Sequence, residues 1–409
     1  MAAGNLHALR HRPLAAYLAG NLVSNCGTWI QNIALAVLVY RLTDGDTFWV
    51  GVVGFSQFAA YGLLAPWSGR AADRFDRRHL GMAAGVANAA IGAALAAVAA
   101  LGAASVAVVC VLALLAGTAT AFATPAVKAL VTGLAPPEDV GRAIALDSAS
   151  YNVARVLGPL LGAAVVAGVG VPWAFALNGA ASLGLTVGLL AAGPVLRPRA
   201  RPSASSASAT ASLAEAVRVV RADPLLLSAF AVVAAVSTAS DAVTTLGPEL
   251  SVDVYGRSDT FAGVLVGAFG LGAIVSVLTL SPALRTTPGR LVGRCSVMAA
   301  GLLVLALARG DALGLAALVV AGGGYLAGNT EASTSIQLGV DDADRGRISA
   351  LWSIAFLGLR PVSSLVLGTT ASVAGARVAA AVATVPLALT VIALVRLARR
   401  RATAPVAAI

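Results

Sequence analysis

The chain has 409 residues, of which 58% are hydrophobic and only 11% are charged, and its mean hydropathy is +0.87. Soluble domains carry about 25% charged residues, so this composition excludes an ordinary water-soluble fold and predicts a protein solvated by the lipid bilayer. The net charge is +10. In a membrane protein of many spans such an excess marks cytoplasmic loops, so we expect no nucleic-acid partner.

The long apolar runs can be divided into membrane spans by their length. A helix that crosses the bilayer needs about 20 mostly apolar residues. On this basis the sequence predicts an all-α membrane protein with twelve transmembrane helices, with breaks at residues 102–105 and 168–172 inside two long apolar runs. The predicted spans cover residues 14–40, 48–68, 79–101, 105–127, 143–168, 173–193, 224–250, 260–283, 291–309, 312–338, 347–371 and 376–397.

The placement of basic residues predicts the orientation of these helices. If the N-terminus is cytoplasmic, 22 of the 28 Lys and Arg residues fall in cytoplasmic segments, four fall outside, and two lie within spans. Cytoplasmic loops of membrane proteins carry the excess of Lys and Arg. We therefore expect both termini to be cytoplasmic, in a multi-pass protein of the cytoplasmic membrane.

The chain is predicted to consist of two six-helix bundles joined by a linker. Residues 1–193 form the first bundle, residues 194–223 the cytoplasmic linker, and residues 224–409 the second bundle. The linker contains three prolines and a Ser/Ala-rich run, which is a flexible composition. Residues 213–220 within it are predicted to form a short amphipathic helix on the membrane surface.

The two bundles are related by an internal repeat. Gly141-Arg-Ala-Ile-Ala-Leu-Asp-Ser148 matches Gly346-Arg-Ile-Ser-Ala-Leu-Trp-Ser353, 205 residues later. The same offset places Arg155 on Arg360 and Ala116-Gly117 on Ala321-Gly322. A duplicated membrane bundle, with a substrate site near the midplane between the repeats, is typical of secondary transporters.

A dense group of charges lies between the second and third predicted helices. Gly69, Asp73, Arg74, Arg77 and Arg78 form the pattern G-x-x-x-D-R-x-x-R-R. This pattern resembles the signature loop between helices 2 and 3 of the Major Facilitator Superfamily of transporters. The glycine is expected to allow a tight turn where the second helix leaves the membrane.

The resemblance implies that this loop is a gate. In the superfamily the aspartate is placed against the start of helix 11, here near Arg347, where free N–H groups and the helix dipole favour an anion. Such a contact would hold the two halves together in the outward-open state. The alternative is a basic loop that only fixes topology. The equivalent segment of the second half, residues 281–290, lacks both the Gly and the Asp.

A second motif lies in the fifth predicted helix. Gly158, Pro159 and Gly162, followed by Ala163, resemble the G-P-x-x-G-G motif of proton-coupled drug exporters. Residues 152–159 and 355–362 are similar to the branch that includes enterobactin and macrolide exporters. The alternative is that the small residues only allow close helix packing.

Five charged residues are expected inside the spans, namely Asp147, Arg155, Asp241, Glu331 and Arg360. The two arginines lie roughly 18–20 Å into their helices, at about 1.5 Å of rise per residue, and are therefore near mid-membrane. Charges at this depth are costly and usually face a partner or a wet cavity, and the three acids are the expected partners. Proton coupling, recognition of substrate charge and permanent structural ion pairs are all open roles.

Polar residues form a stripe on the first predicted helix. Asn21, Asn25, Thr28 and Asn32 share one face of an otherwise apolar helix. The resemblance implies that helices 1, 4, 7 and 10 line a central substrate cavity. Hydrogen bonds between helices of the bundle are the alternative explanation. The other residues expected to line this cavity are Trp29, Thr120, Thr244 and Asn329.

Together these features predict a secondary active transporter that works by alternating access. It is expected to export a small amphipathic drug or secondary metabolite in exchange for protons. An importer or a lipid flippase on the same scaffold is one alternative, and a membrane receptor or scaffold that transports nothing is another. The expected partners are a small-molecule substrate, protons and the lipid bilayer, and the expected state is a monomer.

The sequence shows no sign of an enzyme. It contains no G-x-x-x-x-G-K-[ST] phosphate loop and no H-E-x-x-H zinc motif. Its three cysteines are scattered through apolar segments without C-x-x-C spacing. We therefore expect no metal site, no cofactor and no catalytic residues.

Overall fold

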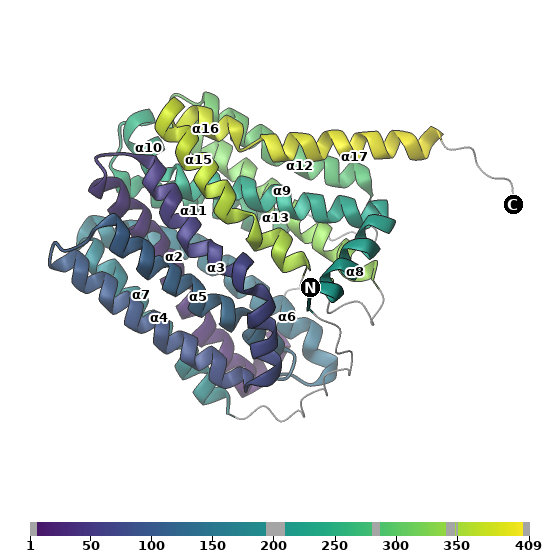
Figure 1. Ribbon diagram of the computed structural model, residues 1–409, viewed down its shortest axis with the longest axis horizontal. Helices are drawn as coiled ribbons and strands as arrows, with labels where there is room; N and C mark the ends of the chain where they lie inside the picture. Colours follow the sequence, from purple (N-terminus) through teal and green to yellow (C-terminus); the bar gives the residue numbers. More distant parts are fainter. Residues whose placement is uncertain (1–5, 194–208, 280–286, 341–347, 349–350, 404–409) are drawn as a thin grey trace, which may run out of the picture.

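The computed structural model describes residues 6–193, 209–279, 287–340, 348 and 351–403, and these residues are almost entirely helical (Figure 1). Within them, twelve helices are long and apolar enough to cross a membrane. The predicted all-α fold with twelve spans is confirmed. The predicted breaks at residues 102–105 and 168–172 also separate helices in the structure.

The first bundle contains six long helices, which pack mainly on one another. They are α2 (Arg12–Leu42), α3 (Thr47–Arg74), α4 (Arg77–Ala100), α5 (Val106–Val131), α6 (Val140–Gly168) and α7 (Val171–Ala192). Two short 3-10 turns, η1 (Leu6–Arg10) and η2 (Pro137–Asp139), precede α2 and α6.

The second bundle repeats this arrangement with more interrupted helices. Its elements are α9 (Pro224–Thr245), α10 (Gly247–Glu249), η3 (Leu250–Val254), η4 (Asp259–Phe261), α11 (Ala262–Thr279), α12 (Pro288–Leu307), α13 (Asp311–Leu338), η5 (Ile354–Gly358), α15 (Arg360–Ala374), α16 (Ala376–Val382) and α17 (Val385–Thr403). The eleventh span, Leu351–Ala374, includes η5 and α15, and the twelfth, Ala376–Leu397, includes α16 and most of α17.

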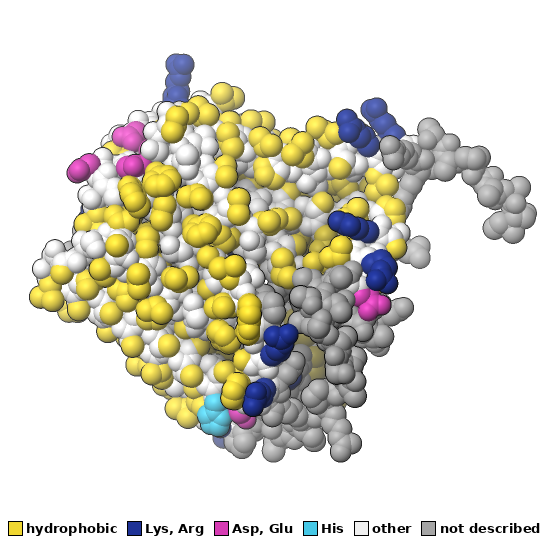
Figure 2. Space-filling view, viewed as in Figure 1, with side chains coloured by type: hydrophobic (Ala, Val, Ile, Leu, Met, Phe, Trp, Pro, Cys, Tyr) yellow, Lys and Arg dark blue, Asp and Glu magenta, His cyan; other side chains and the backbone are white. Residues whose placement is uncertain are grey.

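The alternating helices place their connections on two opposite faces. We call the side on which α2 begins and α17 ends the terminal face, and the side with the connections after α2, α4, α6, α9, α12 and α15 the far face. Hydrophobic side chains cover the middle of the visible surface, and the coloured charged side chains gather toward its two ends (Figure 2). This distribution is expected of a protein surrounded by a bilayer.

Polar residues in the connections begin several of the helices. Asp46 accepts a hydrogen bond from the backbone N–H of Phe48 at the start of α3. Asp76 accepts from the backbone N–H groups of Arg78 and His79 at the start of α4. Such caps satisfy N–H groups that have no partner within the helix. They fix the short connections at both ends of α3.

The turn between α3 and α4 is made by Phe75 and Asp76, not by Gly69. Gly69 lies inside α3, which continues to Arg74, and a Cβ on Gly69 would meet no described residue of a neighbouring helix within 4 Å. The expectation of a tight turn at this glycine is therefore wrong. The helix carries the first part of the charged motif, and only its end forms a loop.

The amphipathic helix predicted at residues 213–220 is part of α8 (Ala209–Ala222), which packs against α9 (Figure 1). Ala216 and Val220 are buried on one side, and Arg218 is exposed on the other. The helix is therefore confirmed, although most of the linker before it lies outside the described residues.

Glycines repeated in the two bundles allow helix backbones to touch. A Cβ added to Gly117 of α5 would lie 1.9 Å from the carbonyl oxygen of Gln57 on α3. A Cβ added to Gly322 of α13 would lie 1.8 Å from the carbonyl oxygen of Phe269 on α11. The repeat detected in the sequence is therefore also a repeat of helix packing.

The two bundles meet along α3 with α15 and along α6 with α11. Near the far face, a Cβ on Gly51 would lie 3.0 Å from the Cα of Gly368, and one on Gly263 would lie 2.4 Å from the carbonyl oxygen of Pro159. At Gly62, further toward the terminal face, the nearest atom across the interface would be at 3.6 Å, an ordinary contact. The bundles thus approach each other most closely near the far face.

Candidate functional site

A buried ion pair lies where the two bundles meet. Nε of Arg360, the first residue of α15, donates to Oδ1 of Asp241 on α9 at 2.6 Å, and Nη2 contacts the same oxygen. The two side chains are only 12% and 2% exposed. The guanidinium carbon also lies 4.1 Å from the ring centroid of Phe58 on α3. Arg360 therefore contacts both bundles at once, and Oδ2 of Asp241 is buried and receives no hydrogen bond from the residues that the structure describes.

Arg155, the repeat equivalent of Arg360, is surrounded by aromatic rings. Its guanidinium carbon lies 4.1 Å from the ring centroid of Tyr325 on α13 and 5.2 Å from that of Phe269 on α11. Trp29 of α2 lies on the same group, at 5.5 Å. The side chain is 6% exposed, and its Nε is buried without a hydrogen-bond acceptor among the described residues. The two repeat-related arginines therefore have different environments.

Asp147 is held by the first helix rather than by either of these arginines. It accepts hydrogen bonds from Tyr17 Oη at 2.8 Å and Asn21 Nδ2 at 3.0 Å, both on α2. Nearby, Nζ of Lys128 on α5 lies 5.1 Å from the ring centroid of Trp352 in the eleventh span. This second contact joins the bundles on the terminal side of the buried ion pair.

Glu331 of α13 is paired inside the second bundle. Its Oε1 accepts from Nε of Arg290 at 2.6 Å, and its Oε2 accepts from Nε of Arg294 at 3.4 Å, both arginines lying near the start of α12. Glu331 lies near the terminal-face end of α13, about 30 Å from its first residue at 1.5 Å per residue. The structure therefore pairs this acid with Arg290 and Arg294, and the described residues show no ion pair between it and Arg155 or Arg360.

The predicted polar stripe on α2 makes several hydrogen bonds inside the first bundle. Asn32 accepts from Gln57 Nε2 of α3 at 2.9 Å, and Thr28 donates to the carbonyl oxygen of its own helix at Ser24. Asn25 is half-buried. A role in lining a cavity stays a prediction for these residues.

The other predicted cavity residues lie on α5, α9 and α13. Thr120 of α5 accepts from Asn88 of α4 at 3.3 Å. Thr244 and Asn329 are both half-buried, and Oδ1 of Asn329 is a buried atom without a partner. The residues that complete the centre of the site were not predicted: Phe58, Phe269 and Tyr325 contact the arginines from other helices.

The glycine–proline motif packs α6 against two helices. A Cβ on Gly158 would lie 2.4 Å from the Cβ of Trp29, and one on Gly162 would lie 3.1 Å from the Cα of Ile30, both on α2. On another side, the carbonyl oxygen of Pro159 touches α11 of the second bundle. The motif therefore provides close packing beside Arg155.

Part of the charged loop is anchored within the first bundle. Nε of Arg78 donates to the carbonyl oxygen of Leu189 at 2.9 Å, and Nη2 to that of Leu190 at 3.2 Å, at the end of α7. A cation at this end of a helix is favoured by the dipole. The side chain of Asp73 and residues 341–347, which the gate would join, lie outside the described residues.

Polar contacts join the bundles at the far face. Tyr40 Oη donates to Asp253 at 3.0 Å. Arg41 forms two hydrogen bonds with Asp259, at 2.5 and 2.8 Å. Each contact links the end of α2 to the connection between α9 and α11. The far face is therefore closed in this conformation by side chains as well as by backbone packing.

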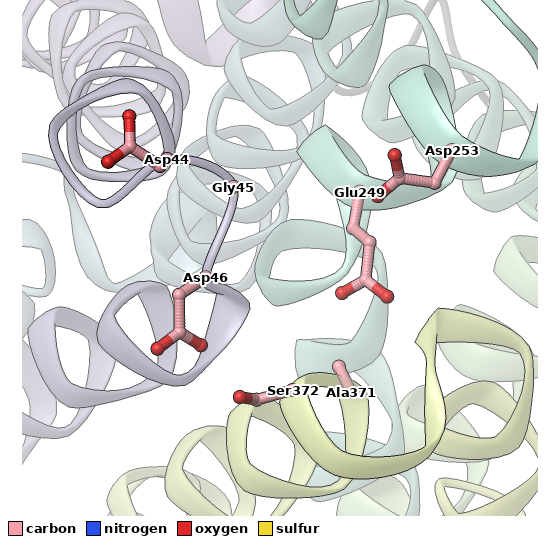
Figure 3. Close-up of a pocket in the computed structure, with 7 residues that line it drawn as sticks. All are labelled: Asp44, Gly45, Asp46, Glu249, Asp253, Ala371 and Ser372. Carbon is pink, nitrogen blue, oxygen red and sulfur yellow. The ribbon is translucent and has the colours of Figure 1, made fainter.

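An acidic pocket of about 240 Å³ lies beside these contacts. It is lined by Asp44, Gly45, Asp46, Glu249, Asp253, Ala371 and Ser372. The carboxylate of Glu249 points into the space between Asp46 and the end of α15 (Figure 3). Glu249 is 8% exposed, and its Oε1 accepts from the backbone N–H of Ala376 at 2.7 Å. Burial raises the pKa of this carboxyl, and the charges of Asp253 and Asp46 raise it further.

This raised pKa predicts that closure of the far face depends on pH. A carboxyl with a raised pKa binds its proton more tightly here than in a solvent-exposed state, so protonation stabilises closure. That stabilisation is present at or below the usual pKa of 4.5 and is lost as pH rises through the raised value. Spin labels at Leu101 and Leu307, on far-face turns of the two bundles, should report a longer distance as pH increases.

Two matched variants separate Glu249 from its acidic neighbours. Glu249→Gln imitates the protonated carboxyl and should keep the labels close at all pH values. Asp44→Asn removes another acid of the pocket and should leave the pH dependence in place. A wild-type distance that does not change with pH, or a response retained in Glu249→Gln, would contradict the prediction.

The twelve-helix fold, with its two repeat-related bundles, is found in a known family of membrane proteins. The family MFS_3, described as transmembrane secretion effector, matches residues 3–407. The chain belongs to this family. It is therefore a multi-pass membrane transporter of the Major Facilitator type. Membership of the enterobactin and macrolide exporter branch stays a prediction.

Sequence and structural relatives agree with this assignment. The uncharacterized MFS-type transporter YfiS of Bacillus subtilis (strain 168) is 23% identical over 310 residues, which cover 76% of this chain and 72% of that protein. A bacterial homologue of the human lysosomal transporter Spinster, inward-facing and occupied, has a TM-score of 0.71 at 16% identity, with 94% and 96% of the two chains covered. A mutant form of the nucleoside transporter NupG has a TM-score of 0.74 at 13% identity, covering 94% and 99%. These two structures support the fold alone.

Proposed function

We propose that this MFS_3 transporter is a proton-coupled exporter of small amphipathic molecules, such as drugs or secondary metabolites. The observation that carries the proposal is the buried pair of Asp241 and Arg360, because Arg360 also lies on Phe58 of the other bundle. A titratable acid is thereby linked to a contact that must change when the bundles rock. Intramembrane acids of this kind commonly act in proton relays.

The proposed coupling follows from the charge of Asp241. A proton on its carboxyl removes the negative charge that holds Arg360, and Oδ2 is the oxygen that has no hydrogen bond within the described part of the chain. Arg360 then loses its counter-ion in a low-dielectric site, which favours a different arrangement of the eleventh span against α3. Loss of the proton restores the pair, so one protonation cycle accompanies one cycle of bundle movement.

Two observations support the proposed direction of transport and the proposed membrane location of the protein. The description of the family as a secretion effector favours movement out of the cell. The excess of Lys and Arg on the terminal face favours a cytoplasmic position for both termini and insertion in the cytoplasmic membrane. Since the proposed path runs between two bundles of one chain, a monomer is sufficient. The charged loop with Asp73 is proposed as the cytoplasmic gate of this path.

Inverted membrane vesicles test this function directly. With a proton gradient established inside the vesicles, an exported substrate should enter them and partly dissipate the gradient, which a pH-sensitive dye reports. Vesicles without the protein give the background. Substrate that moves without any change in the gradient would rule out proton antiport, and substrate that moves only out of the vesicles would indicate an importer.

A further inference from the structure

The centre of the site has more positive than negative charge. Arg155 and Arg360 are both buried there, and within the part of the chain that the structure describes Asp241 forms an ion pair with Arg360 alone. Among the described residues Arg155 forms no ion pair, and its Nε has no hydrogen-bond partner. We propose that Arg155 binds the anionic group of the transported molecule, which is therefore an amphipathic organic anion. This inference rests on the proposed transport function and specifies its substrate.

The missing counter-ion is visible in a comparison of the two bundles. In the second bundle, α9 supplies Asp241 to Arg360 of the eleventh span. In the first bundle, α2 occupies the equivalent position and contains no Asp or Glu between Arg12 and Leu42. A buried charge in a membrane protein ordinarily has a partner or faces a wet path. An anionic substrate would supply the charge that α2 lacks.

No other acid described near the centre is available to Arg155. Asp147, two turns earlier on α6, is held by the two hydrogen bonds from α2. Glu331 is paired with two arginines of α12 near the terminal face. Either acid would have to abandon charged or hydrogen-bonded partners to neutralise Arg155. The substrate is therefore the simpler source of the counter-charge.

The surroundings of Arg155 also indicate the shape of the ligand. Aromatic rings from α2, α11 and α13 lie around the guanidinium group and contribute cation–π attraction. The N–H groups of a guanidinium lie in its plane and match a carboxylate through two parallel hydrogen bonds. The rings provide an apolar surface beside that contact. A carboxylate attached to an aromatic or similar apolar body fits both features.

A matched pair of probes tests this inference on the full-length protein in lipid nanodiscs. The probes are 2-naphthoate and 2-naphthamide, which share one ring system and differ in charge, and binding is measured by isothermal titration. Wild-type protein should bind the naphthoate about tenfold or more tightly than the amide, as expected for hydrogen bonds to a charged group. Arg155→Gln should abolish that preference while leaving the weak affinity for the amide nearly unchanged.

Two further variants distinguish a specific loss of anion binding from a general loss of folded protein. Arg155→Lys keeps the charge but loses the planar two-point contact, so it should retain only part of the preference. Arg257→Gln removes an exposed arginine of the far face and should behave as wild type. The inference is overturned if the wild type does not prefer the anion, or if either Arg155 variant keeps the full preference. If Arg155→Gln does not fold, the Arg155→Lys titration decides.

The binding measurement needs neither transport nor a proton gradient. If vesicle experiments show no antiport but naphthoate binding still depends on Arg155, the function fails and the anion site stands. If antiport is found with cationic or neutral molecules and naphthoate binds no better than its amide, the function stands and the anion site fails. The two proposals therefore have separate tests.

Discussion

Replacing Asp241 by Asn is expected to abolish proton-coupled transport. The amide has nearly the same shape as the carboxylate and can still accept a hydrogen bond from Arg360, but it has no charge and takes up no proton. Arg360 is then buried without its counter-ion, and breaking a buried pair in this way costs about 3–5 kcal/mol. Purified Asp241→Asn in proteoliposomes should show no substrate-driven proton flux and should melt at a lower temperature than wild type.

The double variant Asp241→Asn/Arg360→Gln distinguishes coupling from a structural role. Removing both charges also removes the uncompensated one, so much of the lost stability should return. If the pair serves only to hold helices together, transport should return with stability. If the pair couples protons to movement, the double variant should be stable and still inactive in proton flux. Asp311→Asn, which breaks the exposed far-face pair with Arg257, is the control and should leave the stability nearly unchanged, because solvent screens exposed ion pairs.

Most of the fold follows from features that the sequence displays locally. Span length, the small-residue breaks and the internal repeat predict twelve helices in two bundles, because the bilayer fixes the length of each apolar run. The details that were missed depend on contacts between distant segments. The span predicted at residues 224–250 ends as α9 at Thr245, and short helical turns at Gly247–Glu249 and Leu250–Val254 follow it. Gly69 lies inside α3, which continues to Arg74, because the backbone of a glycine permits helical as well as turn conformations and so does not by itself mark a turn.

The candidate site was predictable only in part, because it too depends on contacts between residues that are distant in the sequence. The 3.6-residue repeat of a helix shows which residues share one face. The free-energy cost of placing a charge in the bilayer identifies the buried charged residues as candidates for the site. Neither shows how one helix is rotated against the next. The sequence thus indicated Asp241, Glu331 and Asp147 as candidate partners for the arginines, and among the described residues geometry assigns Asp241 to Arg360. Of the aromatic residues around Arg155, only Trp29 was expected at the site; Phe269 and Tyr325 gave no signal, since an isolated Phe or Tyr on an apolar helix is ordinary.

The repeated glycines give the second large expected effect. Gly322→Ala should destabilise the second bundle, because the added Cβ would lie 1.8 Å from the carbonyl oxygen of Phe269. That atom belongs to the backbone of α11, so relief requires a shift of the whole helix. Overpacking of this kind costs about 1–3 kcal/mol, and Gly322→Val should cost more and prevent assembly. The thermal midpoint of purified protein and the yield of monodisperse protein measure both effects.

The same argument makes predictions at two other glycines. Gly117→Ala, at the equivalent position of the first bundle, should lose a similar amount of stability because its Cβ would lie 1.9 Å from the carbonyl oxygen of Gln57. Gly293→Ala is the matched control, since this residue lies inside α12 and no atom of the described neighbours lies within 4 Å of the added Cβ. A helical position with free space should gain about 0.4–1 kcal/mol from this change. Equal changes in stability of Gly322→Ala and Gly293→Ala would mean that backbone contact between α11 and α13 does not hold the bundle together.

The glycine variants should also differ in their binding of naphthoate. Because Phe269 of α11 also lies on Arg155, a shift of α11 in Gly322→Ala should weaken naphthoate binding. Gly117→Ala, whose added Cβ meets α3, should leave that binding intact.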